Sequence, residues 1–220
     1  MKKSPYQLLI FDWDGTLVDS QAHIIECMRS AIIDADYEPP KDSVIKNVIG
    51  LSLERASQVL MPHCNDAEIT FISELYREHF FSTGPESSSF FDGALDVIQD
   101  CLDAGFYLAV ATGKSKRGLD LALKTFNLES YFHITRCADE TASKPNPLML
   151  QEILTDLDLH CEQALMIGDT SYDMDMAASA KMDSMAVTYG VHDEETLKQS
   201  NPKYLLHDIK QLLTVLNNSI

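Results

Sequence analysis

Two carboxylates lie two residues apart directly after a short apolar segment. Asp12 and Asp14 follow Gln7–Phe11, whose apolar side chains predict a strand buried on both faces, and Gly15-Thr16 ends the segment. In an extended backbone the two acids project to one side and Trp13 to the other. Carboxylates that share one space repel each other unless a cation lies between them or one carries a proton. The pair therefore indicates a metal site or acid–base chemistry, with a simple Asp-Gly turn as the alternative.

The longer run from Phe11 to Ser20, FDWDGTLVDS, resembles the signature of the haloacid dehalogenase superfamily. The resemblance implies that Asp12 is a nucleophile. It also implies that Asp14 is the acid/base, because the phosphatase branch has this second Asp. The branches that cleave carbon–halogen or phosphorus–carbon bonds lack it. The motif therefore favours hydrolysis of phosphate esters.

A second candidate lies where the predicted strand Tyr107–Thr112 runs into a turn and the predicted helix Lys116–Phe126. A helix start offers free backbone N–H groups and a partial positive charge, which can hold phosphate oxygens together with the Thr112 hydroxyl. The alternative is a simple N-cap by Thr112 or Ser115. The superfamily's second motif has Thr or Ser at such a strand end, so the resemblance implies a catalytic role for Thr112. We also expect Gly113 to contact substrate, although related phosphatases often carry Asn there.

A lysine that could act near the nucleophile stands in Ser143-Lys144-Pro145, where the proline favours an extended backbone. A solvated surface lysine is the alternative. A cation beside the nucleophile would offset the crowding of carboxylate and phosphate charge. The resemblance assigns that role to Lys144.

Two further acids, Asp169 and Asp173, follow the predicted strand Ala164–Ile167 in the pattern G-D-x-x-x-D. Alone they could be turn and cap residues, but the resemblance implies that they complete a metal site. Hard oxygen ligands suit Mg²⁺. We expect Asp12 and Asp169 to bind it through carboxylates and Asp14 through its backbone carbonyl. Asp173 is expected to act through water or by orienting the lysine.

Helices and strands alternate in the second part of the chain. The predicted strands are Tyr107–Thr112, Phe132–Arg136, Ala164–Ile167 and Ser184–Val187, and the predicted helices are Gly93–Ala104, Lys116–Phe126, Pro147–Leu157 and Asp173–Ala180. This alternation predicts an α/β fold, a Rossmann-like parallel sheet with helices on both faces. Ligands in such sheets bind at the carboxyl ends of the strands, where the candidate residues lie.

Residues 17–88 instead predict a mostly helical insert. Helical patterns follow Ser20 and recur at Asp42–Ile49, Leu53–Met61 and Ala67–Phe81, before a Gly/Pro/Ser linker at 82–89. We therefore expect a core of residues 1–16 and 89–220 and a cap domain of 17–88, which the resemblance implies closes over the site. The loop Gly50–Leu53 is a candidate for substrate selection. Arg55 could anchor a substrate carboxylate, or it is a surface arginine on a helix.

Composition limits the partners. The 220 residues are 45% hydrophobic and 23% charged, as in ordinary globular proteins, and 17 basic against 34 acidic residues give a net charge of −17. This charge disfavours nucleic acid and opposes anionic substrates, so the site must supply its own cations. No stretch approaches the roughly 18–20 apolar residues of a membrane span, and Leu8–Phe11 is too short for a signal-peptide core. Five scattered cysteines favour reduced thiols, so we expect a cytoplasmic protein.

Together these patterns predict a Mg²⁺-dependent hydrolase of a small phosphorylated metabolite, resembling phosphoglycolate phosphatases, as a monomer or homodimer. The resemblance implies an aspartyl-phosphate on Asp12. A sugar phosphomutase with the same core is the alternative among enzymes. A phospho-accepting receiver domain is the alternative from another class, although the D-x-D spacing and the large insert argue against it.

Overall fold

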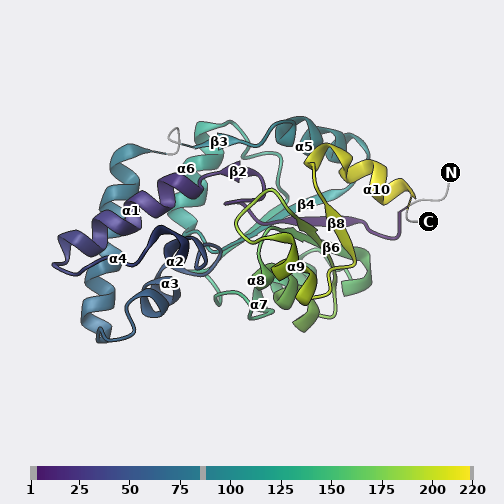
Figure 1. The fold of residues 1–220 in the computed structure, drawn as a ribbon. Coiled ribbons are helices and arrows are strands. Elements are labelled where there is room, and N and C mark those ends of the chain that lie inside the picture. The colour runs from purple at the N-terminus through teal and green to yellow at the C-terminus, as the bar shows by residue number, and fades with distance from the viewer. Residues whose placement is uncertain (1–3, 85–87, 219–220) are drawn as a thin grey trace.

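A computed structural model describes residues 4–84 and 88–218, and its centre is a six-stranded sheet in the order β5-β4-β1-β6-β7-β8 (Figure 1). The strands are β1 (Leu8–Phe11), β4 (Tyr107–Thr112), β5 (Ile134–Cys137), β6 (Ala164–Gly168), β7 (Asp183–Val187) and β8 (Tyr204–Leu206). Every neighbouring pair in this sheet is parallel. The predicted α/β fold is confirmed.

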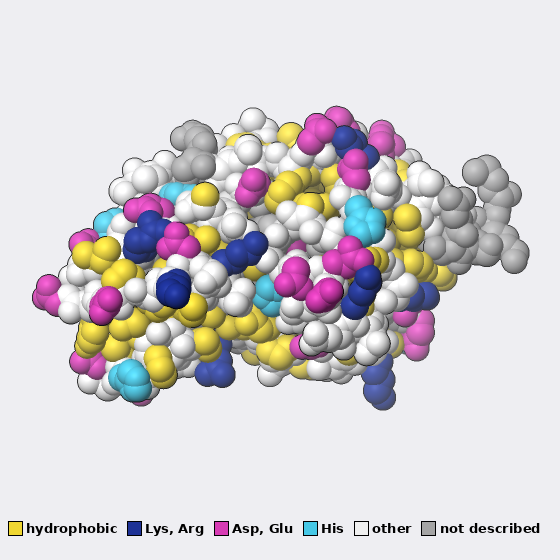
Figure 2. Space-filling view, in the orientation of Figure 1, with side chains coloured by type: hydrophobic (Ala, Val, Ile, Leu, Met, Phe, Trp, Pro, Cys, Tyr) yellow, Lys and Arg dark blue, Asp and Glu magenta, His cyan; other side chains and the backbone are white. Residues whose placement is uncertain are grey.

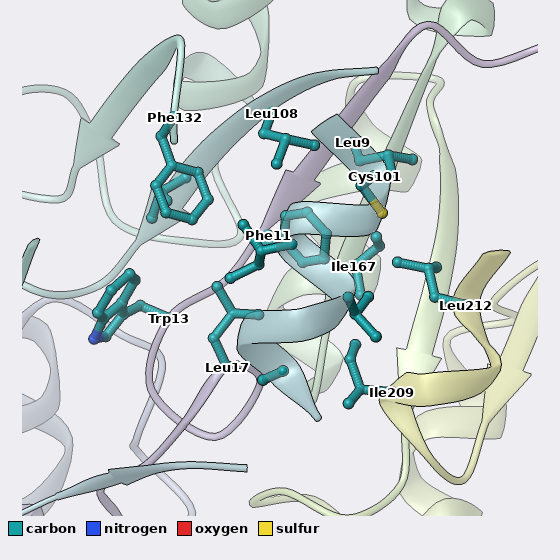
Figure 3. Close-up of a cluster of buried hydrophobic side chains, with 14 of the residues drawn as sticks. Leu9, Phe11, Trp13, Leu17, Cys101, Leu108, Phe132, Ile167, Ile209 and Leu212 are labelled. Atoms are coloured by element: carbon teal, nitrogen blue, oxygen red, sulfur yellow. The ribbon is translucent and has the colours of Figure 1, made fainter. Parts of the chain in front are cut away.

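Helices cover both faces of the sheet. They are α5 (Ala94–Asp103), α6 (Lys116–Thr125), α7 (Leu148–Asp156), α8 (Ser171–Ser179), α9 (Glu194–Gln199) and α10 (Leu212–Asn218), with short 3-10 turns at Cys161–Gln163 and Ile209–Gln211. Alternate residues of β1 belong to different clusters: Leu9 and Phe11 pack with α5, α6 and α10, whereas Leu8 and Ile10 pack with α7 and α8. Figure 3 shows the first cluster. Because both faces are covered, the central strands are apolar throughout.

Four helices form a second unit beside the sheet, on the left of Figure 1. They are α1 (Gln21–Asp34), α2 (Asp42–Lys46), α3 (Leu53–Leu60) and α4 (Asp66–Thr83). This helical unit has its own buried core, to which Ile32, Ile45 and Ile72 belong. Apolar side chains also remain on its outer surface (Figure 2). Ile33 and Phe71 of this unit are exposed.

A two-stranded antiparallel ribbon joins the helical unit to the sheet. It pairs β2 (Val18–Asp19) with β3 (Ser89–Phe90), so the chain leaves and returns at one place. The expected elements are present with small shifts at their ends, but β2, β3, β8, α9 and α10 were not predicted. Two-residue strands paired across about 70 residues leave no local periodicity in the sequence. Residues 85–87 of the expected linker lie outside the described residues.

No helix in the described ranges is both long enough and apolar enough to span a bilayer.

Candidate active site

Three adjacent strands bring predicted residues to one edge of the sheet. Asp12 directly follows β1, Thr112 ends β4, and Asp169 directly follows β6. The backbone N–H of Asp12 still donates to the carbonyl of Ile167 at 2.9 Å, so β1 and β6 stay paired up to the acid. Strand β1 lies between β4 and β6, which is the switch point where parallel sheets of this kind place their ligands.

Lys144 arrives from the loop between β5 and α7. Its Nζ lies 2.8 Å from Oδ1 of Asp12 and 2.7 Å from Oδ1 of Asp173, and its side chain is fully buried. Burial alone would lower the pKa of Lys144, but the charges of the two acids outweigh burial and raise it. The lysine therefore stays protonated. The prediction of an extended segment here was wrong, because Asn146 N–H donates to Ser143 O at 3.0 Å and closes a turn.

Asp173 holds both this lysine and the start of α8. Its Oδ1 accepts from Lys144, and its Oδ2 accepts from the backbone N–H of Thr170 at 3.1 Å and from the Thr170 hydroxyl at 2.7 Å. This reciprocal contact is a capping box at the start of α8. Asp173 thus caps α8 and contacts the Lys144 ammonium at the same time.

Asp169 is also buried and held from two sides. Its Oδ1 accepts from the Thr16 hydroxyl and its Oδ2 from the backbone N–H of Val191, both at 2.8 Å. Burial, followed by the charge of Asp173, raises the pKa of Asp169 to about 7. Gly15, with φ of +87°, leaves the room that this carboxylate needs, because a Cβ there would lie 2.2 Å from Asp169 Oδ2.

The carboxylates of Asp12, Asp169 and Asp173 form one buried group, with one oxygen of each within 4.8 Å of the others. Within the described chain, Oδ2 of Asp12 is buried and has no hydrogen-bond partner. Burial raises the pKa of Asp12, and the charge of Lys144 offsets only part of that rise. Three carboxylates lie around the single ammonium of Lys144, so negative charge exceeds positive charge in this group. The surplus of hard oxygen donors over positive charge fits a divalent cation such as Mg²⁺.

Asp14 occupies a separate position. Its Oδ1 accepts from the Ser20 hydroxyl at 2.7 Å, and Nζ of Lys114 lies 3.0 Å from Oδ1 and 2.9 Å from Oδ2. Sequence reasoning gave Lys114 no role, although it lies in the quoted turn after Thr112. A lysine before a helix is common, and only the fold shows that this one reaches the acid 100 positions away.

The carboxylates of Asp12 and Asp14 both line a cavity of about 100 Å³ between the sheet and the helical unit. Thr112, Gly113 and the loop Gly50–Leu53 line it too. A Cβ on Gly113 would lie 2.4 Å from the carbonyl oxygen of Leu51, so only glycine lets this loop pack so closely. The predicted substrate-selecting loop therefore forms part of the cavity wall.

Arg55 is not brought to this cavity. Its side chain is exposed, and its nearest polar partner is Gln58, 3.5 Å away. In α3 the residues that line the cavity are Leu53, Glu54 and Ala56, and Arg55 is not among them. The arginine that does line the cavity is Arg77 of α4, which pairs with Glu54.

Comparisons with known proteins agree on one family. The sequence model described as haloacid dehalogenase-like hydrolase matches residues 9–187. The chain is 31% identical over 212 residues to "Probable phosphatase IndB" of Dickeya dadantii, covering 94% of this chain and 91% of that protein. It is 24% identical over 227 residues to a phosphoglycolate phosphatase of Vibrio parahaemolyticus, covering 98% of both. A crystal structure of a hydrolase from Pseudomonas syringae, 22% identical, shares the fold with a TM-score of 0.88, covering 97% of this chain and 99% of that one.

Proposed function

The chain belongs to the haloacid dehalogenase-like hydrolase family, as a phosphatase of that family, and from this premise we propose that it hydrolyses small phosphomonoesters through a phosphoryl group carried on Asp12. One observation carries the proposal. Oδ2 of Asp12 is buried without a hydrogen-bond partner in the described part of the chain, while Oδ1 is held by Lys144. An oxygen kept free beside a fixed cation suits a nucleophile that attacks phosphorus.

Asp12 attacks the phosphorus atom, and the bond from phosphorus to the alcohol oxygen breaks. Asp14 lines the same cavity and gives its proton to the departing alkoxide. It then takes a proton from the water that attacks the aspartyl-phosphate, which releases phosphate and restores Asp12. Lys144, the Thr112 hydroxyl and the backbone N–H of Gly113 balance the charge on the phosphoryl oxygens.

The residues that would hold Mg²⁺ are Asp12 and Asp169 through their carboxylates and Asp14 through its backbone carbonyl. When bound, Mg²⁺ would offset the negative charge of the carboxylates and of the phosphoryl oxygens. Asp173 orients Lys144 through the contact at 2.7 Å. We assign residues 1–16 and 89–220 to the catalytic core and 17–88 to a cap that closes over the substrate, because the helical unit has its own core and its loop walls the cavity.

The test is phosphate release from a panel of small phosphomonoesters, with Mg²⁺ and with excess chelator. We expect turnover with Mg²⁺, none with chelator, and none in Asp12→Asn under either condition. Undiminished turnover in chelator would exclude the metal, and turnover by Asp12→Asn would exclude the nucleophile. Isomerisation of a hexose 1-phosphate would identify a phosphomutase. A single phosphorylation without turnover would identify a receiver-like protein.

A further inference from the structure

The cap side of the cavity is largely apolar. The side chains that the helical unit contributes to the wall include Met28, Ile45, Ile49, Leu51 and Phe80. Met28, Ile45 and Ile49 are each less than 6% exposed, so water reaches them poorly. A group that packs against these side chains loses its hydration and gains apolar contacts in return. An unpaired anion there would be strongly disfavoured.

Both cations that line the cavity in the described ranges are already paired. Lys114 holds both carboxylate oxygens of Asp14 at 2.9 and 3.0 Å, and its side chain is only 9% exposed. Arg77 pairs with Glu54, and both side chains are partly exposed to water. An anionic group on the leaving alcohol would have to share one of these cations with a carboxylate. Asp139 also lines the cavity and adds to the repulsion.

The cavity is also small. Its volume is about 100 Å³, compared with about 150 Å³ for an apolar cavity that binds benzene. With the helical unit in this position, a leaving group more compact than an aromatic ring fits best.

We infer that the preferred substrate is the phosphomonoester of a compact alcohol whose body is apolar and carries no second anion. This inference rests on the proposed function and narrows it. It separates this chain from an enzyme that selects a carboxylate-bearing ester such as phosphoglycolate. The apolar cap wall and the two paired cations select against a charged leaving group, and the small cavity volume selects against a large one.

The test compares two esters of nearly equal size, isobutyl phosphate and phosphoglycolate. Their leaving groups have the same number of non-hydrogen atoms, and an isopropyl group in one replaces a carboxylate in the other. We expect kcat/KM for isobutyl phosphate to exceed that for phosphoglycolate at least about tenfold, which corresponds to about 1.4 kcal/mol in transition-state stabilisation. Propyl phosphate should resemble isobutyl phosphate, and phenyl phosphate should be slower because of its size.

A variant should reverse the preference. Met28→Lys places an ammonium on the apolar wall with little change in side-chain length, and we expect it to raise the ratio of phosphoglycolate to isobutyl phosphate turnover at least tenfold. Met28→Leu is the matched control and should keep the wild-type ratio. If Met28→Lys does not fold, Asp12→Asn with Mg²⁺ offers a binding test. It should bind 3-methylbutylphosphonate, the analogue of isobutyl phosphate, more tightly than 3-phosphonopropionate, the analogue of phosphoglycolate.

Equal or better turnover of phosphoglycolate would overturn this inference and leave the proposed function intact. If Lys114→Met then abolished that turnover selectively, Lys114 would be a carboxylate anchor that leaves Asp14 when substrate binds. Turnover restricted to larger or doubly anionic esters would overturn the inference as well. Hydrolysis of no phosphomonoester at all would overturn the proposed function, and this inference with it.

Discussion

Replacing Lys144 by Met removes the only cation that the buried acids share among the described residues. In the native protein its ammonium lies within 2.8 Å of both Asp12 and Asp173, and its side chain is fully buried. The side chains of the two acids are 1% and 0% exposed, so water cannot replace the lost ammonium. Met fills the space of the lysine stem without leaving a large cavity. The change therefore isolates the loss of charge.

The expected loss is large. Deleting one partner of a buried ion pair costs about 3–5 kcal/mol, because the remaining charge stays buried and uncompensated. About 4 kcal/mol corresponds to roughly a thousandfold change in the folding equilibrium constant. Domains are stable by only about 5–15 kcal/mol, so this single side chain would remove a considerable part of the total.

The assay is urea unfolding in chelator at pH 8 and at pH 5. Lys198→Met is the matched control, since it removes the same charge from an exposed ion pair with Glu194 and should cost less than about 1 kcal/mol. The loss for Lys144→Met should shrink at pH 5. Deleting the ammonium raises the already elevated pKa of Asp12 further, so the folded variant takes up a proton that relieves the repulsion. Equal losses at positions 144 and 198, or a loss that does not depend on pH, would refute this reasoning.

Three further predictions follow from the site. In chelator, the free energy of unfolding should fall as the pH rises from about 4 to about 7, because the pKa of Asp169 is raised to about 7 and the folded protein keeps a proton that the unfolded chain has lost. Excess Mg²⁺ should flatten this pH dependence in thermal unfolding. A slope that Mg²⁺ leaves unchanged would contradict the assignment of Asp169 as a metal ligand. Asp14→Asn should impair hydrolysis of an alkyl phosphate more than that of p-nitrophenyl phosphate, whose leaving group needs no acid. With p-nitrophenyl phosphate, a phosphorylated Asp12 should accumulate and be detected by intact-mass spectrometry after acid quenching. Equal losses with both substrates and no phosphoenzyme would point to direct attack by water. Gly113→Ala should lower kcat/KM by as much as about a hundredfold, because its Cβ would lie 2.4 Å from the carbonyl oxygen of Leu51 and displace the loop Gly50–Leu53. The circular dichroism spectrum should stay normal. Unchanged kinetics would show that the loop moves freely.

The sequence predicts the core of the site because the signals there are local. The apolar run before Asp12 marks a strand, a second apolar run ends at Asp169, and parallel strands place their carboxyl ends together. The order of the strands brings Thr112 to the same edge. The motifs already name the side chains of the buried carboxylate group and Lys144, so their proximity follows once the strands are placed.

The cap side was harder to predict because it depends on rotation and on distant pairing. A helix turns by about 100° per residue, so an error of one position exchanges a cavity-lining residue for an exposed one. This is why Arg55 was expected at the cavity, whereas Leu53 and Ala56 line it. Arg77 lies on another helix, and no local pattern distinguishes it from a surface arginine.

Asp14, the proposed acid/base, is physically connected to the wall that the helical unit forms, so we expect turnover and substrate choice to be linked. Asp14 accepts from Ser20, the residue before α1, and from Lys114, whose Nζ lies 4.6 Å from the centre of the Phe80 ring near the end of α4. Asp14 is thus connected to the start of the helical unit directly through Ser20, and to its end indirectly through Lys114 and Phe80. A movement of that unit that carries Phe80 away opens Lys114 to water and weakens its attraction to Asp14, because solvent screens the pair. We therefore expect a substrate that fills the apolar cavity and keeps Phe80 in place to keep the proposed acid/base Asp14 paired with Lys114, and a poorly fitting substrate to lose both effects.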